Sequence, residues 1–126
     1  MNYKGVIIEE SLENPILIKD LTILETKVEQ VTASHQTPWL KQWTLHTVEI
    51  PENKAEEIAR KIGQNLETEH MAWYADFKND GYHFIIFSNR VFKVDRTKPE
   101  EYENVKRYGV NLGIPDYQLD FSPDIK

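Results

Sequence analysis

The residues whose types and spacing could support chemistry are a histidine and a carboxylate on two neighbouring predicted strands. Asp80-Gly81 lies between two aromatic-rich runs and is the strongest hairpin signal in the chain. A two-residue loop at this dipeptide places His83 opposite Lys78 and diagonal to Asp76, with Tyr74 two residues further along the same face. A carboxylate beside an imidazole fixes the tautomer of the ring, which is the minimal arrangement for acid/base catalysis. His83, Asp76, Tyr74 and Lys78 are therefore candidate catalytic residues, although the same spacing is also typical of a cross-strand salt-bridge cluster.

A second group of candidates lies in and after the connection over residues 33–42, which is long by the usual standard of two to six residues. Loops of this kind often carry function. Trp39 and Trp43 are candidate binding residues, and the loop around Trp39 could act as a lid; the alternative is that both rings plug one end of the core. His46 is a further binding candidate, but its apolar strand face is more typical of a hydrogen-bonded, partly buried histidine.

The stretch over residues 78–98 is locally basic, with five Lys or Arg residues against two Asp, and aromatic residues lie between them. Aromatic side chains on a sheet that are flanked by basic residues can stack the bases of single-stranded nucleic acid. Arg90 and Lys93 are the candidate binding residues for such a ligand. The net charge of -6 argues against a nucleic-acid partner, and the alternative is core aromatics with solvated charges at the strand ends.

Metal and cofactor motifs are lacking from the sequence. There is no cysteine, and the four histidines show no HxH or HExxH spacing. No GxGxxG, Walker A, GxSxG or EF-hand pattern occurs. We therefore expect no metal and no cofactor, and the sequence leaves open whether the protein is an enzyme.

These candidates must be positioned by the stretch over residues 72–95, which predicts three short strands in a meander. Asp80-Gly81 predicts a type I′ turn, because glycine readily supplies a positive φ. Asn89 tolerates the left-handed conformation that the second turn needs. The middle strand is apolar on both faces, so we expect helices on one face and loops, the C-terminal tail or another subunit on the other.

The remaining chain predicts further strands and two helices. Residues 3–12 suit a strand with Val6 and Ile8 facing inward, and residues 22–32 and 43–50 suit two more strands. A helix after residue 53 has Asn53 as its expected cap and Gly63 as a point of close approach to the sheet. A second helix has Thr97 as its expected cap and Gly109 as its expected end.

The predicted fold is therefore α+β, with a mainly antiparallel sheet of five to six strands and two helices. At 126 residues we expect a single domain over residues 1–126. The sequence shows no signal peptide and no apolar run long enough to span a membrane, so we expect a soluble cytoplasmic protein.

Three stretches, TPWLKQWTLHTVEIP, AWYADFKNDGYHFIIF and NLGIPDYQLDF, resemble a set of small uncharacterised single-domain proteins from prokaryotes. The resemblance covers nearly the whole chain and implies no activity, ligand or catalytic residue. The sequence favours a noncatalytic protein-interaction or ligand-binding module that associates with itself as a homodimer, with another protein, or with a small molecule. The alternatives are an acid/base enzyme that uses His83 and Asp76, and single-stranded nucleic-acid binding through residues 78–98.

Overall fold

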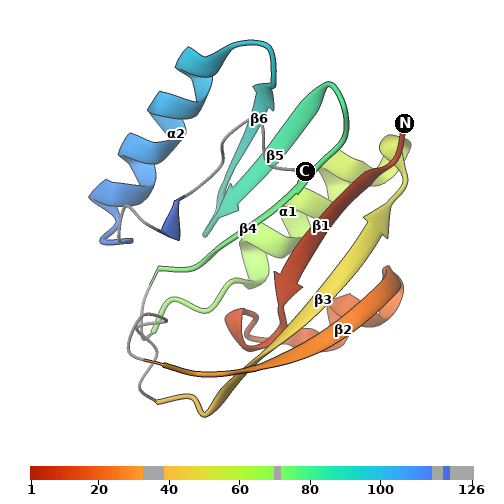
Figure 1. Cartoon of the computed structure of the whole chain (residues 1–126), viewed down its shortest axis with the longest axis vertical. Helices are drawn as coiled ribbons and strands as arrows, with labels where there is room; N and C mark the ends of the chain where they lie inside the picture. Colours follow the sequence, from red (N-terminus) through yellow and green to blue (C-terminus); the bar gives the residue numbers. More distant parts are fainter. Residues whose placement is uncertain (33–38, 70–71, 115–117, 120–126) are drawn as a thin grey trace.

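The strands form one antiparallel sheet. The computed structural model describes residues 1–32, 39–69, 72–114 and 118–119. Within them, six strands lie in the order β2-β3-β1-β4-β5-β6 (Figure 1). Their bounds are β1 Tyr3–Ile8, β2 Thr22–Gln30, β3 Gln42–Ile50, β4 Tyr74–Lys78, β5 Tyr82–Phe87 and β6 Arg90–Asp95. All neighbouring pairs are antiparallel, which confirms the predicted α+β fold and its meander.

Helices pack on both faces of this sheet, which corrects the expectation that they cover one. Helix α1 (Ala55–Asn65) packs on one face together with two 3-10 turns, η1 (Glu9–Ser11) and η2 (Pro15–Asp20). Helix α2 (Pro99–Asn111) packs on the other face, over β5 and β6 (Figure 1). We call these the α1 face and the α2 face. A helix therefore packs on each face of the middle strand β5, which accounts for the apolar side chains on both of its faces.

The meander has the predicted register but a different first turn. Lys78 lies opposite His83 and Asp76 lies opposite Ile85, as expected. The predicted type I′ turn was wrong, because positive φ angles in the described residues occur only at Asn89 and Gly113. The Asn79 side chain builds the turn instead, since its Oδ1 accepts hydrogen bonds from the backbone N–H groups at positions 81 and 82. An Asx-type turn thus gives the same register without left-handed residues.

Two glycines in the helices allow close packing. A Cβ at Gly63 would lie 3.1 Å from the carbonyl oxygen of Phe87, which confirms the predicted close approach of α1 to the sheet. Gly109 was expected to end α2, but the helix continues to Asn111. A Cβ at Gly109 would lie 2.8 Å from Leu119 Cδ2, so its absence makes room for the buried Leu119.

The predicted caps were wrong at both helices. Neither Asn53 nor Thr97 occupies the N-cap position, and the residues that do, Lys54 and Lys98, make no side-chain cap hydrogen bond. Thr97 instead donates from its backbone N–H and its hydroxyl to Asp95 Oδ1. This small turn connects β6 to α2.

Strand β1 faces the opposite way from the prediction. Tyr3 and Ile7 point into the α1-face core, whereas Val6 is 39% exposed on the α2 face, with Ile8 partly buried at its far end. The α2 face of β1 and β3 therefore carries no helix in the described part of the chain. Helix α2 contacts the β6 end of the sheet, away from β3 and β2 (Figure 1).

Candidate functional site

Four side chains form a hydrogen-bonded chain under the α2 face, with its two middle members buried and its two ends partly exposed. The His83 ring is buried, with Nε2 2.6 Å from Asp76 Oδ2 and Nδ1 3.1 Å from the Tyr102 hydroxyl. An ionised carboxylate can only accept, so we assign the imidazole proton to Nε2, and Nδ1 then accepts from Tyr102. The Tyr102 oxygen in turn accepts a hydrogen bond from the Arg96 guanidinium. Every donor in the chain therefore points toward Asp76.

Each of these residues is positioned by the packing of α2 on the meander. The β4–β5 register puts Asp76 and His83 on one face, two residues apart along the ladder. Tyr102 is the first buried residue of α2, and its ring meets the His83 ring edge to face at 5.7 Å. Arg96 follows β6 and also donates to the Asn79 carbonyl oxygen. The chain thus joins two strands, one turn and one helix.

The surroundings shift the pKa values of two members of this region. Burial raises the pKa of Tyr102, with Asp76 adding to the rise and the Arg96 charge and hydrogen bond opposing it. Burial lowers the pKa of Lys78, and the Arg96 charge adds to this while Asp76 opposes it. Both shifts favour the neutral forms of these side chains.

Asp76 and Arg96, at the two ends of the chain, both reach the groove surface, and Asp76 is the carboxylate among them. Its side chain is 35% exposed, whereas that of His83 is 2% exposed. Two hollows on the α2 face meet at Val6 and Asp76: one of about 310 Å³ and one of about 960 Å³. We call the two together the open-face groove. A molecule in this groove can contact the Asp76 carboxylate but not the His83 ring beneath it.

The groove changes from charged to apolar along the strands. At one end the register aligns Glu49, Lys4 and Lys78 side by side across β3, β1 and β4. In the middle it aligns Thr47, Val6 and Asp76. The other end is apolar and is lined by Ile8, Trp43, Leu45, Ala72, Trp73, Tyr74, Ile114 and Gln118.

Two of the predicted residues help to form the apolar end. The Tyr74 hydroxyl donates to the backbone carbonyl oxygen of Gln118, which holds its ring beside the groove. Trp43 lines the same hollow and packs against Trp73 with 5.5 Å between ring centroids. Trp39 is partly exposed, and most of the loop before it lies outside the described residues, so its expected role as a lid stays a prediction.

The other predicted binding residues lie elsewhere. His46 is on the α1 face, where Nδ1 lies 2.9 Å from Thr26 Oγ1 and Nε2 lies 3.1 Å from Glu9 Oε1. It is the hydrogen-bonded, partly buried histidine that its strand position indicated. Arg90 stacks on Phe92, on the α2 face, and Lys93 points to the α1 face.

The aromatic rings of the basic stretch are mostly inside the protein. Phe84 and Phe87 are buried in the two cores. Tyr82 remains exposed, and Lys93 already lies over its ring. Nucleic-acid binding stays an untested prediction, and the buried rings offer no stacking surface for it.

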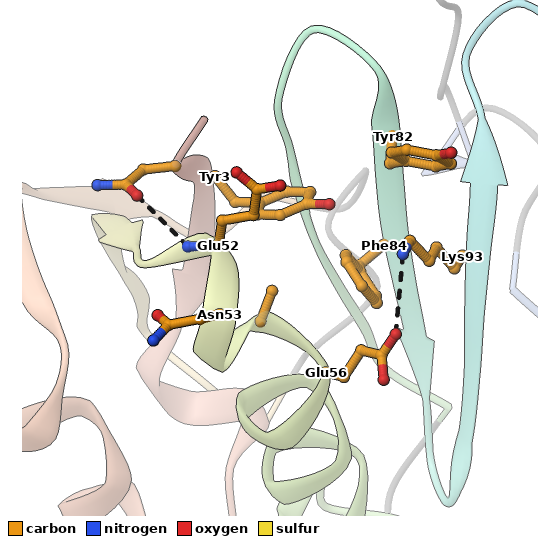
Figure 2. Close-up of a pocket in the computed structure, with 9 residues that line it drawn as sticks. Tyr3, Glu52, Asn53, Glu56, Tyr82, Phe84 and Lys93 are labelled. Carbon is orange, nitrogen blue, oxygen red and sulfur yellow. Dashed lines mark hydrogen bonds and ion pairs between the residues drawn. The ribbon is translucent and has the colours of Figure 1, made fainter.

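Lys93 lines a further hollow, of about 550 Å³, beside the start of α1 (Figure 2). Its ammonium lies 4.6 Å from the centroid of the Tyr82 ring, 5.6 Å from that of Phe84 and 3.7 Å from Glu56 Oε1. Burial and the nearby Glu52 raise the pKa of Tyr3 in the wall of this hollow. The chain thus supplies its own cation to this aromatic and acidic pocket.

Sequence reasoning missed Tyr102, Arg96, Lys4 and Val6 as parts of the site. Tyr102 was recognisable only as an inward-facing helix residue, although a buried tyrosine hydroxyl usually has a partner. In the described residues no group of three or more His, Asp or Glu side chains is placed to hold a metal ion. None of the described helices is long and apolar enough to cross a membrane. Comparison with protein-family models, curated proteins and solved structures found no match.

Proposed function

We propose that the protein binds a small amphipathic carboxylic acid in the open-face groove. The observation that carries the proposal is the change from charged to apolar lining across two adjacent hollows that share Val6 and Asp76. A molecule of this class would lay its apolar body near Trp43 and its carboxylate at the charged end. Ligand sites commonly combine an apolar wall with a few polar groups that fix orientation.

The charged end favours an anionic group. Lys4 and Lys78 lie directly opposite each other on β1 and β4, an arrangement that is unfavourable for like charges. Arg96 lines the same hollow and helps to lower the pKa of Lys78. A carboxylate between the two lysines would relieve this repulsion, with Glu49 balancing Lys4 from the β3 side.

Asp76 adds a requirement for a hydrogen-bond donor on the ligand. It lies at the junction of the two hollows, and His83 already donates to one of its oxygens. A hydroxyl or ammonium group next to the ligand carboxylate could donate to this side chain. The proposed ligand class is therefore a hydroxy or amino acid with a large apolar substituent.

A panel of matched compounds tests the proposal by thermal shift and isothermal titration. Aromatic hydroxy and amino acids should raise Tm, because a ligand at 100 times its Kd adds about 2.7 kcal/mol. The corresponding amides, which lack the negative charge, should bind more weakly. Lys78→Met should abolish the difference between acid and amide, and Lys54→Met on the exposed start of α1 should preserve it. Equal shifts from acids and amides would argue against the proposal.

A second candidate function is acid/base catalysis on such a molecule, with Asp76 as the base. It is favoured by the donor chain through Tyr102 and His83, because hydrogen bonds to a carboxylate fix its orientation. His83 would then be a positioning residue rather than the catalytic residue first expected. Turnover of a bound acid should be lost in Asp76→Asn while binding persists; a compound that binds but is never converted would leave only the binding function.

A further inference from the structure

Strand β2 is an open edge of the sheet with exposed apolar side chains. It is nine residues long and, among the described strands, lies beside β3 alone (Figure 1). Ile23, Leu24 and Val28 are between 42% and 51% exposed. An edge strand presents unpaired backbone N–H and C=O groups to any second strand that fits it.

The geometry of antiparallel pairing restricts how two copies of β2 can meet. Residues directly opposite each other are either both hydrogen-bonded or both not, and this state alternates along the strand. In a symmetric pair the two-fold axis must therefore pass between one residue and its own copy. The register centred on the strand Thr22–Gln30 places Thr26 at the axis, within the part of β2 that follows the β-bulge between Ile23 and Glu25.

In this register the strand is complementary to itself. Glu25 of each copy faces Lys27 of the other, so the pair contains two opposite-charge contacts. Leu24 lies in the β-bulge between Ile23 and Glu25 and so stands outside the regular pairing. A lysine in an edge strand usually blocks pairing with another chain, but here its neighbour across the axis is a carboxylate.

The other edge of the sheet lacks this property. In β6 the central registers place the axis at Phe92 or at Lys93. The first puts Lys93 opposite Val91, and the second puts Lys93 opposite its own copy. Neither register pairs opposite charges, and the Lys93 ammonium already contacts Glu56.

We propose that the protein forms a two-fold symmetric dimer by antiparallel pairing of β2 with β2 of a second copy, with Thr26 at the axis. The two sheets then form one continuous sheet across both copies. The β-bulge between Ile23 and Glu25 adds twist near each end of the new ladder, beyond the central charge pairs. The open-face groove is lined by residues of β1, β3 and β4 and by no residue of β2, so the dimer does not depend on the proposed ligand.

Charge reversal tests the dimer and its register together. Sedimentation equilibrium should show a dimer for the wild type, and Lys27→Glu should raise the dissociation constant by about tenfold or more, since two attractive pairs become repulsive. The double variant E25K/K27E should restore dimerisation, because the same pairs return with their charges exchanged. Lys54→Glu makes the same change in net charge on an exposed turn and should leave the dimer intact.

A cysteine cross-link provides an independent measurement, because the protein contains no cysteine. Thr26→Cys should form a disulfide dimer on mild oxidation, since opposite residues in a sheet lie within disulfide distance. Val28→Cys should not, because position 28 lies two residues from the axis and does not face its own copy. A monomeric wild type, or a double variant that stays as weak as Lys27→Glu, would overturn the proposal, as would faster cross-linking at position 28 than at position 26.

Discussion

The two halves of the sheet are built differently. The half formed by β4, β5 and β6 is covered on both faces, by α1 on one and by α2 on the other. In the half formed by β2, β3 and β1, β1 and β3 are covered on the α1 face, β2 is exposed along most of its length, and the α2 face carries no helix in the described residues. Because elements pack on both faces of the meander, its aromatic side chains are buried. The other half has no helix on its α2 face in the part of the chain that the structure describes, and this face therefore remains accessible.

The candidate site lies where the two kinds of coverage meet. Asp76 is on β4, at the inner border of the covered half, and Val6 beside it is on β1 of the open half. Buried groups of the covered half, His83 and Tyr102, hold the carboxylate from below. A rigid, fully packed half thus presents a chemical group to an open one, which is how preorganised sites are usually supported.

A substitution at the junction between the halves should lower the free energy of unfolding more than the other substitutions proposed below. A Cβ at Gly5 would lie 2.1 Å from the carbonyl oxygen of Asp76 and 2.7 Å from Phe77 Cα, both backbone atoms of β4. Gly5→Ala should therefore lower the free energy of unfolding by more than about 4 kcal/mol, or prevent folding. Gly81→Ala is the matched control, since its Cβ would meet only Asn79 Oδ1 at 3.9 Å, and it should cost less than about 1 kcal/mol in urea unfolding. Similar costs for both variants would contradict the close junction.

Truncation of an apolar side chain should lower the free energy of unfolding more in the covered half than in the open half. Phe87 is fully buried in the covered half and packs against the rings of Tyr74, Phe92 and Tyr108. Phe87→Ala should cost about 3 to 5 kcal/mol in chemical denaturation. Val6→Ala on the open face should cost less than about 1 kcal/mol. A large cost at Val6 would mean that this face is covered after all.

The hydrogen-bonded chain predicts a smaller and pH-dependent effect. Tyr102→Phe removes the donor to the buried His83 Nδ1 and should cost about 1 to 3 kcal/mol at neutral pH. An unfolded tyrosine ionises near pH 10.0, whereas burial raises the pKa of Tyr102 in the folded protein. The unfolded state therefore releases its proton first, and wild-type stability falls as the pH rises above about 10.

In Tyr102→Phe this fall should become shallower, with the part due to Tyr3 remaining. Thermal unfolding between neutral pH and alkaline pH measures the difference, and the exposed Tyr82→Phe variant is the control. An unchanged slope in Tyr102→Phe would show that Tyr102 does not carry the alkaline loss.

The smallest effect on stability is expected at Lys78. Burial of its ammonium lowers its pKa, so the folded state gains little from the charge. Lys78→Met should leave the free energy of unfolding within about 0.5 kcal/mol of the wild type in denaturant titrations. A clear destabilisation would indicate that Lys78 maintains the fold and is not kept for a ligand.

The covered half was also the half that the sequence predicted best. Two aromatic-rich runs around Asp80-Gly81 determine the register, because a shift of one residue would place Phe77 and Phe84 on opposite faces of the sheet. The adjacency of His83 and Asp76 followed from that register alone. The turn type did not follow, because the Asn79 side chain can build a different turn with the same register.

The open half was predicted less well because its pattern is ambiguous. Val6, Ile7 and Ile8 are consecutive apolar residues, so alternation could not decide which face of β1 is inside. The contributions of Tyr102 and Arg96 depend on where α2 packs, which is a tertiary property that no local pattern contains. The sequence therefore identified the carboxylate and the imidazole but not Tyr102 and Arg96, which continue the chain beyond the imidazole.

Mapping of ligand binding by backbone amide NMR shifts tests the central claim most directly. With an aromatic hydroxy or amino acid, we expect the shift changes to cluster on β1, β3 and β4, around Val6, Asp76 and Trp43. The α1 face should stay unchanged, including the hollow around Lys93. Shift changes centred on Lys93 and the start of α1, or no changes with any member of the acid series, would contradict the assignment of the open half as the functional face.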